Sequence, residues 1–560
     1  MKNLSTLFNL LLFFSGALLA QSGELDPSFA DNGIFAWDIN GQHDVPNGMA
    51  IQEDGKMVFM LSLDYPTVFN FDVAIVRLNQ DGSIDSTFAE NGIYHYINPA
   101  ATDLGYGIQV LDDGKILASG AHGTSNANPE MLLIKLNPDG TPDETFGNNG
   151  IVIQPIGTSE DYAFCFSLTA EGKIIAGGIS YLPGYNYQRN VVCRFNANGS
   201  LDSTFADNGV FLWNDNMTHN DILDVAVTEE GDILACGMSA PAGTDRLSIY
   251  KILEDGSALD STFATNGELL APFQGKAYGI IIHSNGNILI AGNNTNVNGS
   301  DLLVLAYRQD GSPNLDFGQD GIFIIDANIN DYASALIEQP DGKVIAVGSS
   351  GGAFLSLPPG GFFSVRMDAM GNLDTSWGGT GYVTTAMSTG IGSRALDVAL
   401  QADGKVVLAG AWANDQGNDM MVIRYGNFID ADMDGYGLEE DCNDNVFAIN
   451  PGAEEIPNNE IDEDCDGMDL MVGLHETALA QQFNVYPNPT NNTVNIDFDQ
   501  ASFTIEFIEI YDYQGKKVEN ITEISANNNI TIDLSDFPKG LWVLTFHTNA
   551  GIFGKRVVKI

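Results

Sequence analysis

One phrase of sequence recurs seven times along this chain. In each copy an aromatic residue stands four positions before a glycine, and the aromatics are Phe29, Phe88, Phe146, Phe205, Phe263, Phe317 and Trp377. Successive copies lie 54 to 60 residues apart. A repeat of this length is typical of propellers and solenoids, in which each copy is one supersecondary unit. Residues shared by all copies are therefore expected to be scaffold, and specificity is expected where the copies differ.

Each copy contains four short apolar runs. In the second copy they are 107–111, 115–119, 131–136 and 150–154, rich in Val, Ile and Leu and separated by Asp, Asn and Gly. This pattern is typical of antiparallel strands joined by tight turns, and helical periodicity is absent. The sequence therefore predicts an all-β chain whose residues 21–427 form a seven-bladed β-propeller.

The two ends of the repeat region are complementary. The chain enters on a fourth strand, 33–38, and leaves on a third strand, 420–425, so the last blade lacks its own outer strand. Pairing these two segments would close the ring through the N-terminal strand and remove both unpaired edges. We expect that pairing.

The recurring phrase also carries a family resemblance. Leu-Asp-Ser-Thr-Phe-Ala-Asp-Asn-Gly at 201–209, together with the Asp-Gly-Lys turns, resembles the delta-60 repeat family of bacterial surface proteins over about residues 25–427. Copy six departs slightly, since Asn314 and Asp316 precede Phe317. The resemblance implies a propeller fold and brings no activity or ligand with it.

An aspartate stands three positions before the aromatic in six copies: Asp26, Asp85, Asp143, Asp202, Asp260 and Asp374. A ring of catalytic carboxylates is one interpretation. The favoured one is structural, because Asx turns need this residue type at this place. The aromatic itself is expected to plug the space between blades.

Composition excludes some functions. The formal net charge of −51 excludes nucleic acid as a partner, because a phosphate backbone needs a cationic face. Residues 1–20, with Lys2 and an apolar run from Leu7, resemble a secretory signal peptide. No later stretch has the length of a membrane span, so none is expected.

The five cysteines fall into two groups. Cys165, Cys193 and Cys236 lie in apolar strand patterns and are expected to be buried free thiols. Cys442 and Cys465 lie in an acidic segment and are the natural disulfide pair in an exported chain. Closing that loop would stabilise the segment by about 3 kcal/mol on the chain-entropy model.

The loops between second and third strands, and between blades, differ from copy to copy and form the expected ligand face. The candidate residues on it are Asp44, Tyr65, Asp103, Asp161, Tyr181, Tyr185, Tyr187, Asp221, Asp331 and Trp412. Exposed Tyr and Trp suit a glycan or a protein partner. The same loops are also open to interpretation as solvated connectors of a purely structural surface protein.

An enzyme is a further alternative. His43 and His219 stand near Asp44 and Asp221, and the alternative interpretation is a hydrolase or lyase centre at the propeller mouth. No nucleophile elbow or zinc-ligand spacing is present in the sequence. We therefore expect a binding protein rather than an enzyme.

An acidic module follows at 428–467. Asp430, Asp432 and Asp434 take positions one, three and five of an EF-hand-type loop, the Tyr436 carbonyl takes position seven, and Asp441 takes position twelve. A second opening has the acids Asp462, Asp464 and Asp466 but no closing acid. The stretch resembles the metal-binding motif of bacterial surface proteins, some of which are associated with copper. Ligands that are all oxygen favour structural Ca²⁺.

Residues 468–483 are expected to be a linker, followed by a last domain at 484–560. Tyr-Pro-Asn-Pro at 486–489, Tyr-Asp-Tyr-Gln-Gly-Lys at 511–516 and a basic terminus resemble the type A sorting domain of the type IX secretion system. The resemblance implies a small β-sandwich, the outer-membrane type IX machinery as partner, and a protein that is secreted or attached to the outer cell surface.

Overall fold

The computed structural model describes most of the chain beyond the first 21 residues. The described residues are 22–560 except for 40, 42, 65–70, 99–101, 124–127, 158–159, 182–187, 214–218, 241–242, 328–329, 352–359, 388–391, 415–416, 433, 435, 439–440, 454, 457–458, 460, 466, 468–482, 498–503, 514, 523–528 and 550. The predicted signal peptide and nearly all of the predicted linker lie outside them. The chain divides into two compact units between Phe447 and Ala448.

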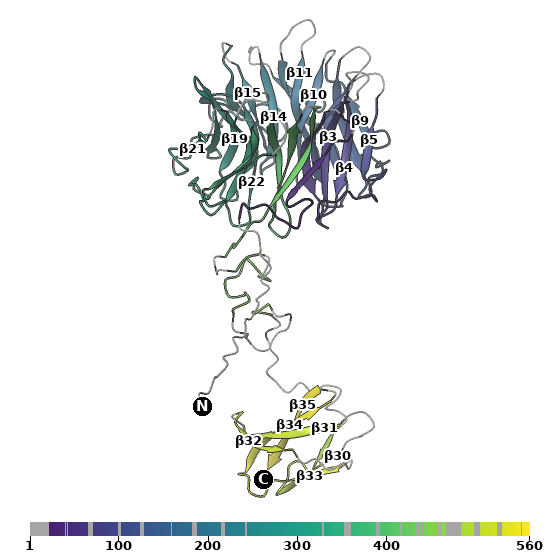
Figure 1. Ribbon diagram of the computed structural model, residues 1–560, viewed down its shortest axis with the longest axis vertical. Helices are drawn as coiled ribbons and strands as arrows, with labels where there is room; N and C mark the ends of the chain where they lie inside the picture. Colours follow the sequence, from purple (N-terminus) through teal and green to yellow (C-terminus); the bar gives the residue numbers. More distant parts are fainter. Residues whose placement is uncertain are drawn as a thin grey trace, which may run out of the picture. The chain divides into compact units, whose positions relative to one another are not determined.

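The described residues of the first unit form seven four-stranded antiparallel sheets, several of whose strands are labelled in Figure 1. Sheet 1 is β2 (Asp44–Ile51), β3 (Met57–Asp64), β4 (Phe71–Leu78) and β5 (Ile93–Tyr96); sheet 2 is β6 (Leu104–Val110), β7 (Ile116–His122), β8 (Glu130–Leu136) and β9 (Ile151–Gln154). Sheet 3 is β10 (Asp161–Leu168), β11 (Ile174–Tyr181), β12 (Gln188–Phe195) and β13 (Val210–Trp213); sheet 4 is β14 (Asn220–Val227), β15 (Ile233–Ser239), β16 (Arg246–Ile252) and β17 (Glu268–Gln274). Sheet 5 is β18 (Ala277–Ile282), β19 (Ile288–Asn296), β20 (Gly299–Tyr307) and β21 (Ile322–Ile325); sheet 6 is β22 (Asp331–Glu338), β23 (Val344–Ser350), β24 (Gly361–Met367) and β25 (Tyr382–Thr385).

Sheet 7 is built from both ends of the unit. It contains β26 (Gly392–Leu400), β27 (Val406–Ala413) and β28 (Asn418–Tyr425), and its outer strand is β1 (Ile34–Trp37). β1 runs antiparallel to β28, with Ile34 opposite Ile423 and Trp37 opposite Met420. This is the pairing that the sequence predicts, and it gives the outer edge of β28 a hydrogen-bonding partner.

Each sheet packs face to face on the next one in chain order, and sheet 7 packs on β2 of sheet 1. The second strands are therefore covered on both faces, and every residue of β3 is buried. Burial on both faces explains why these strands are continuous apolar runs rather than alternating ones. Cys236 lies on such a second strand, β15, while Cys165 lies on β10 and Cys193 on β12; all three are buried free thiols, as predicted.

The recurring aromatics lie between sheets. All seven are at most 1% exposed. Phe88, from the β4–β5 turn of sheet 1, has Arg77 stacked 4.5 Å above its ring centroid. It reaches the turn of sheet 2, where a Cβ on Gly140 would lie 2.8 Å from the ring, and Gly140 also has a φ of +87°. Only glycine suits that turn, because the phenyl ring occupies the side-chain space.

A backbone hydrogen bond accompanies each aromatic. The residue after the aromatic donates its N–H to a carbonyl of the next sheet at 2.7–2.9 Å: Ala30 to Asp81, Ala89 to Asp139, Gly147 to Asn198, Ala206 to Asp255, Ala264 to Asp310, Gly318 to Met370 and Gly378 to Ser22. The last bond joins sheet 6 to the segment that leads into β1. The same contact is thus repeated from sheet to sheet and returns to the N-terminal segment.

The aspartates of the phrase are structural. Asp85 accepts hydrogen bonds from the Thr87 backbone N–H (3.0 Å) and hydroxyl (2.6 Å), and its other oxygen lies 2.9 Å from Arg77 Nε. The same Asx turn occurs at Asp26, Asp143, Asp202, Asp260 and Asp374. The turn interpretation is therefore confirmed.

The second unit contains two sheets that share one hydrophobic core. One sheet has the order β29 (Asn484–Tyr486), β30 (Thr493–Asp497), β33 (Asn529–Asp533); the other has the order β32 (Lys517–Ile521), β31 (Ile505–Tyr511), β34 (Gly540–Thr548), β35 (Gly551–Lys559). Ile496, Ile532, Ile508 and Phe546, two from each sheet, are buried in that core. Over the described residues of both units, no helix is long and apolar enough to cross a bilayer.

Truncating one of the repeated aromatics tests the packing. We expect Phe205→Ala to lower the free energy of unfolding by about 3–5 kcal/mol, because it leaves a cavity beneath Arg194 and beside Gly256. Denaturant unfolding of the exported chain measures it. Ile324→Ala is the matched control, since Ile324 is 44% exposed and should cost less than about 1 kcal/mol. An equal loss of unfolding free energy in both variants would contradict the role of Phe205 in filling the space between sheets.

The Asx turns predict acid sensitivity. Burial raises the pKa of Asp85, but hydrogen bonds from Thr87 and Lys56 and the charge of Arg77 outweigh it and lower the pKa from 3.8 to about 2; Asp143 behaves likewise. Because the folded pKa lies below the unfolded one, these groups stabilise the fold above about pH 4, and their contribution is lost as the pH falls from 3.8 toward 2. Melting temperatures measured from pH 5 to pH 2 should fall across this window. A flat profile there would argue against these ion pairs.

Candidate functional site

A cavity of about 830 Å³ lies at the centre of the first unit. Residues from β2, β6, β10, β14, β18, β22 and β26 line it, so every one of the seven sheets contributes its first strand. Its walls are rich in aromatic side chains, among them Tyr106, Phe164, Tyr278 and Tyr332. Tyr278 and Tyr332 lie with ring centroids 6.3 Å apart, and Tyr106 meets Phe164 edge to face at 4.9 Å.

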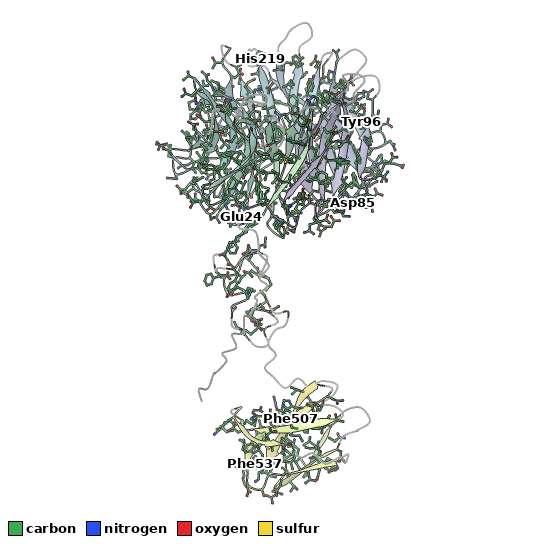
Figure 2. The ribbon with its side chains drawn as sticks, in the orientation of Figure 1. Glu24, Asp85, Tyr96, His219, Phe507 and Phe537 are labelled. Atoms are coloured by element: carbon green, nitrogen blue, oxygen red, sulfur yellow. The ribbon has the colours of Figure 1, made fainter. Side chains whose placement is uncertain are left out.

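The residue one position before the register shift of the first strand is equivalent in all seven sheets, and these residues are Val45, Leu104, Tyr162, Asp221, Lys276, Tyr332 and Arg394. Of these, Tyr332 and Arg394 line the cavity. We name the five that are aromatic or charged, from Tyr162 to Arg394, the mouth residues. Lys276 Nζ lies 3.0 Å from an Asp221 oxygen. Figure 2 shows His219, two residues before Asp221, at the end of the sheets opposite Asp85 and Glu24. The mouth residues therefore lie at the end of the sheets that carries the variable loops, which we call the variable-loop end. The Asp-Gly turns lie at the opposite end.

Four of the predicted ligand-face aspartates turn inward. Asp44, Asp103, Asp161 and Asp331 have no exposed surface. Their carboxylates accept backbone N–H groups: Ile39 to Asp44 (2.6 Å), Gly123 to Asp103 (2.8 Å), Ile156 to Asp161 (2.9 Å) and Ala327 to Asp331 (2.7 Å). In this structure they shape the loops between sheets.

Asp221 differs from these four. In register, Asn220 takes their place, because the register shift of β14 follows Ile222. Asp221 is therefore displaced by one residue and becomes a mouth residue. By its spacing in the sequence, Asp221 was grouped with the four aspartates that accept loop N–H groups. The strand register shows that it occupies a different position.

Of the five aromatic residues predicted for the ligand face, the structure describes two. The hydroxyl of Tyr181 accepts a hydrogen bond from Gln188 Nε2 at 2.5 Å, and Trp412 is half-buried against the core between sheets 6 and 7. Tyr65, Tyr185 and Tyr187 lie outside the described residues.

Two acids of the cavity wall were not predicted, because no motif or spacing in the sequence distinguishes them. Asp224 accepts hydrogen bonds from the backbone of Ile280 (2.9 Å) and Val225 (2.8 Å), and Asp397 from Met49 (2.8 Å) and Val398 (2.8 Å). Burial raises the pKa of Asp224 to about 7 and that of Asp397 to about 6. Each links its strand to the neighbouring sheet.

The acidic module brings carboxylates together in the first unit. Oxygens of Asp430, Asp432 and Asp444 lie within 4.8 Å of one another, as do those of Asp432, Asp434 and Asp441. The Asp434 backbone N–H donates to Asp430 (3.1 Å) and Asp432 (3.2 Å), which curls the loop around its acids. Asp444 was not among the predicted ligands, because the twelve-residue loop ends at Asp441.

The chemistry of this acid set fits a metal ion. One buried carboxylate oxygen on each of Asp432, Asp434, Asp441 and Asp444 has no hydrogen-bond partner. Burial and the nearby carboxylates Asp441, Asp432 and Asp430 raise the pKa of Asp444. Like charges held together without donors are costly, and a cation offsets that cost.

The second half of the module belongs to the second unit. Glu455, Asp462 and Asp464 bring carboxylate oxygens within 4.8 Å of one another, and Glu455 also accepts the Glu463 N–H at 2.7 Å. Glu455 supplies the closing acid that the second loop lacks in sequence. Asp466 lies outside the described residues. Cys442 and Cys465 are disulfide-bonded, as predicted.

Three family models match the chain. The DUF5122 beta-propeller model, a domain of unknown function, matches residues 69–88, 111–146 and 170–205. The Cu-binding MopE metal-binding motif matches 441–469, and the secretion system C-terminal sorting domain matches 484–560. The chain is therefore an all-β protein that combines DUF5122-type propeller repeats, a metal-binding motif and a type IX sorting domain. Type IX export makes it secreted or attached to the cell surface.

No curated protein matches the chain significantly. Among solved structures, a protein of unknown function from Dyadobacter fermentans is 11% identical, with 72% of this chain and 100% of that one covered and a TM-score of 0.38. A fungal alcohol oxidase of the AA5 family in complex with copper is 13% identical (94% and 98%; 0.39), and Sqt1 from Chaetomium thermophilum is 10% identical (73% and 99%; 0.36). Likenesses this weak say nothing about activity.

Mutation can test whether Asp444, which the sequence did not predict, coordinates the metal. We expect Asp444→Asn to weaken metal binding by the module at least tenfold, because it removes one of the buried oxygens without a donor. Isothermal titration of the full chain with Ca²⁺ measures it. Asp54→Asn, at an exposed Asp on a propeller turn, is the control and should leave binding unchanged. Unaltered binding by Asp444→Asn would exclude Asp444 as a ligand.

Proposed function

We propose that this protein is a non-enzymatic binding protein, displayed or released by type IX secretion, whose propeller takes a glycan at the variable-loop end of its central cavity. The observation that carries the proposal is the set of mouth residues. Tyr332 and Arg394 line the cavity, and Tyr162, Asp221 and Lys276 occupy the equivalent register position on their own first strands.

The proposal includes a closed, seven-bladed ring. It is supported by the seven sheets, by the pairing of β1 with β28 and by the repeated hydrogen bond that returns to Ser22. A rigid ring presents side chains from seven sheets around one axis, so a ligand is bound without reorganisation of the scaffold. We further propose that the two sheets of the sorting domain form a sandwich around their shared core.

The mouth has the chemistry of sugar recognition. Pyranose rings present apolar C–H faces and a rim of hydroxyls, so an aromatic face beside paired charged groups matches both. Arg394 and Tyr332 line the cavity directly, on the neighbouring strands β26 and β22. Lys276 and Asp221 hold each other at 3.0 Å and offer both donors and acceptors.

A hydrolase or lyase is the less favoured function. Asp44, Asp103, Asp161 and Asp331 accept backbone N–H groups and have no exposed surface, which suits loop structure more than catalysis. His43 accepts the Asn418 N–H at Nδ1 (3.1 Å). These contacts support a binding role for the mouth.

We also propose that the module at 428–467 binds structural Ca²⁺. All of its gathered ligands are carboxylates, which are hard oxygen donors and suit Ca²⁺ better than copper. With the disulfide, the ion would stiffen the spacer between the propeller (21–427) and the linker (468–483). The sorting domain (484–560) would be recognised by the outer-membrane machinery.

A glycan array probed with the exported chain tests the binding function. We expect Tyr332→Ala and Arg394→Gln each to weaken binding to the selected glycan at least tenfold. Tyr382→Ala is the matched control, because Tyr382 lies on outer strand β25 and is 37% exposed. Binding that is lost equally in all three variants, or capture of a protein but of no glycan, would overturn the proposal.

A further inference from the structure

Three carboxylates gather where sheet 7 meets sheet 1. Asp38 follows β1, Asp44 begins β2, and Asp419 is the second residue of β28. Their oxygens lie within 4.8 Å of one another. Asp44 has no exposed surface and Asp419 is 2% exposed, while Asp38 is open to solvent. This acidic group lies outside the acidic module and was not predicted as a set.

One of the buried oxygens has no protein donor. Asp419 Oδ2 accepts a hydrogen bond from Asn414 Nδ2, whereas Asp419 Oδ1 is buried and has no hydrogen-bond partner. Neither Asp38 nor Asp419 pairs with a Lys or Arg in the part of the chain that the structure describes. His43 Nδ1 accepts the Asn418 N–H, so this ring nitrogen does not donate a hydrogen bond to the acids. A buried carboxylate oxygen beside two other acids needs a cation or a donor.

The next junction shows what protein donors do at the same place. Between sheets 1 and 2, Asp72 and Asp103 correspond in register to Asp419 and Asp44, and Ile97 takes the place of Asp38. There the backbone N–H of Asn98 donates a hydrogen bond to Asp72 (3.1 Å), and the side-chain amide of Asn98 donates one to Asp103 (3.2 Å). The pair is thus bridged by the protein itself, and Ile97 rather than an acid holds the third position, although Asp103 Oδ2 is also buried without a hydrogen-bond partner.

A second junction also has three acids. Between sheets 5 and 6, Asp301, Asp326 and Asp331 occupy the corresponding positions. Asp301 Oδ2 there accepts hydrogen bonds from Asn296 (2.8 Å) and Asn294 (3.4 Å). Asp301, the counterpart of Asp419, thus has two side-chain donors on Oδ2, and no ion is assigned to that junction.

We propose that Asp38, Asp44 and Asp419 bind a divalent cation of the Ca²⁺ type at the junction of sheets 7 and 1. Three hard oxygens provide part of the coordination that Ca²⁺ requires, and water can complete it on the side of Asp38. The ion would tie the end of the N-terminal strand to β28 and β2. It would therefore secure the place where the chain's two distant segments join. This site is independent of glycan binding.

Calcium stoichiometry of the full chain tests the site. We expect Asp38→Asn to bind one equivalent of ⁴⁵Ca²⁺ fewer than the wild type in equilibrium dialysis, while the module's equivalents remain. Asp38 is exposed, so the isosteric change leaves the fold intact. Asp31→Asn is the matched control, an exposed acid of the same N-terminal segment, and should bind as the wild type does.

Hydrogen exchange provides a local readout that the acidic module does not influence. Calcium should slow amide exchange over residues 34–39 at least tenfold in the wild type and leave it unchanged in Asp38→Asn. Equal calcium equivalents in Asp38→Asn and the wild type, or exchange over 34–39 that ignores calcium in the wild type, would overturn the proposal.

Discussion

The contact between one sheet and the next is the constraint on which the first unit depends. The six recurring phenylalanine rings are each buried against a glycine turn of the neighbouring sheet, and the residue after each of the seven aromatics donates a backbone hydrogen bond to the next sheet or to the N-terminal segment. The aspartate three positions earlier holds the corner, and in several copies an arginine spans the aspartate and the ring, as Arg77 does for Asp85 and Phe88. The same contact therefore recurs between successive sheets and returns to Ser22 of the N-terminal segment.

Aspartate serves three different purposes in this protein, and its surroundings decide which. At Asp85 strong donors surround the carboxylate, and its pKa falls to about 2. At Asp224 two backbone donors face a larger desolvation cost, and the pKa rises to about 7. At Asp444 and Asp419 an oxygen is buried without any donor, which is the environment that a cation stabilises. The carboxylates of this protein thus lie in environments of different kinds, and Asp221 is the acid among the mouth residues.

Some of the site was within reach of sequence reasoning. The acids Asp430, Asp432, Asp434 and Asp441 follow local loop spacing, so they could be found by counting along the chain. The buried role of Asp85 was also local, since an Asx turn involves residues only two apart. Asp444 and Glu455 were missed because they enter their acid groups from beyond the loop that counting defines. Asp221 was grouped with Asp161, although a register shift sets them on different positions around the cavity.

The sequence by itself determined the all-β class, the repeated unit, the disulfide and the export signal. Each of these depends on spacing within a few residues, or on a motif that is read as a linear string. The tertiary structure decided which side chains face the cavity, and it brought Asp38 beside Asp419 across nearly the whole length of the propeller. Such neighbours depend on strand register and on how sheets pack, and no local pattern along the chain encodes either.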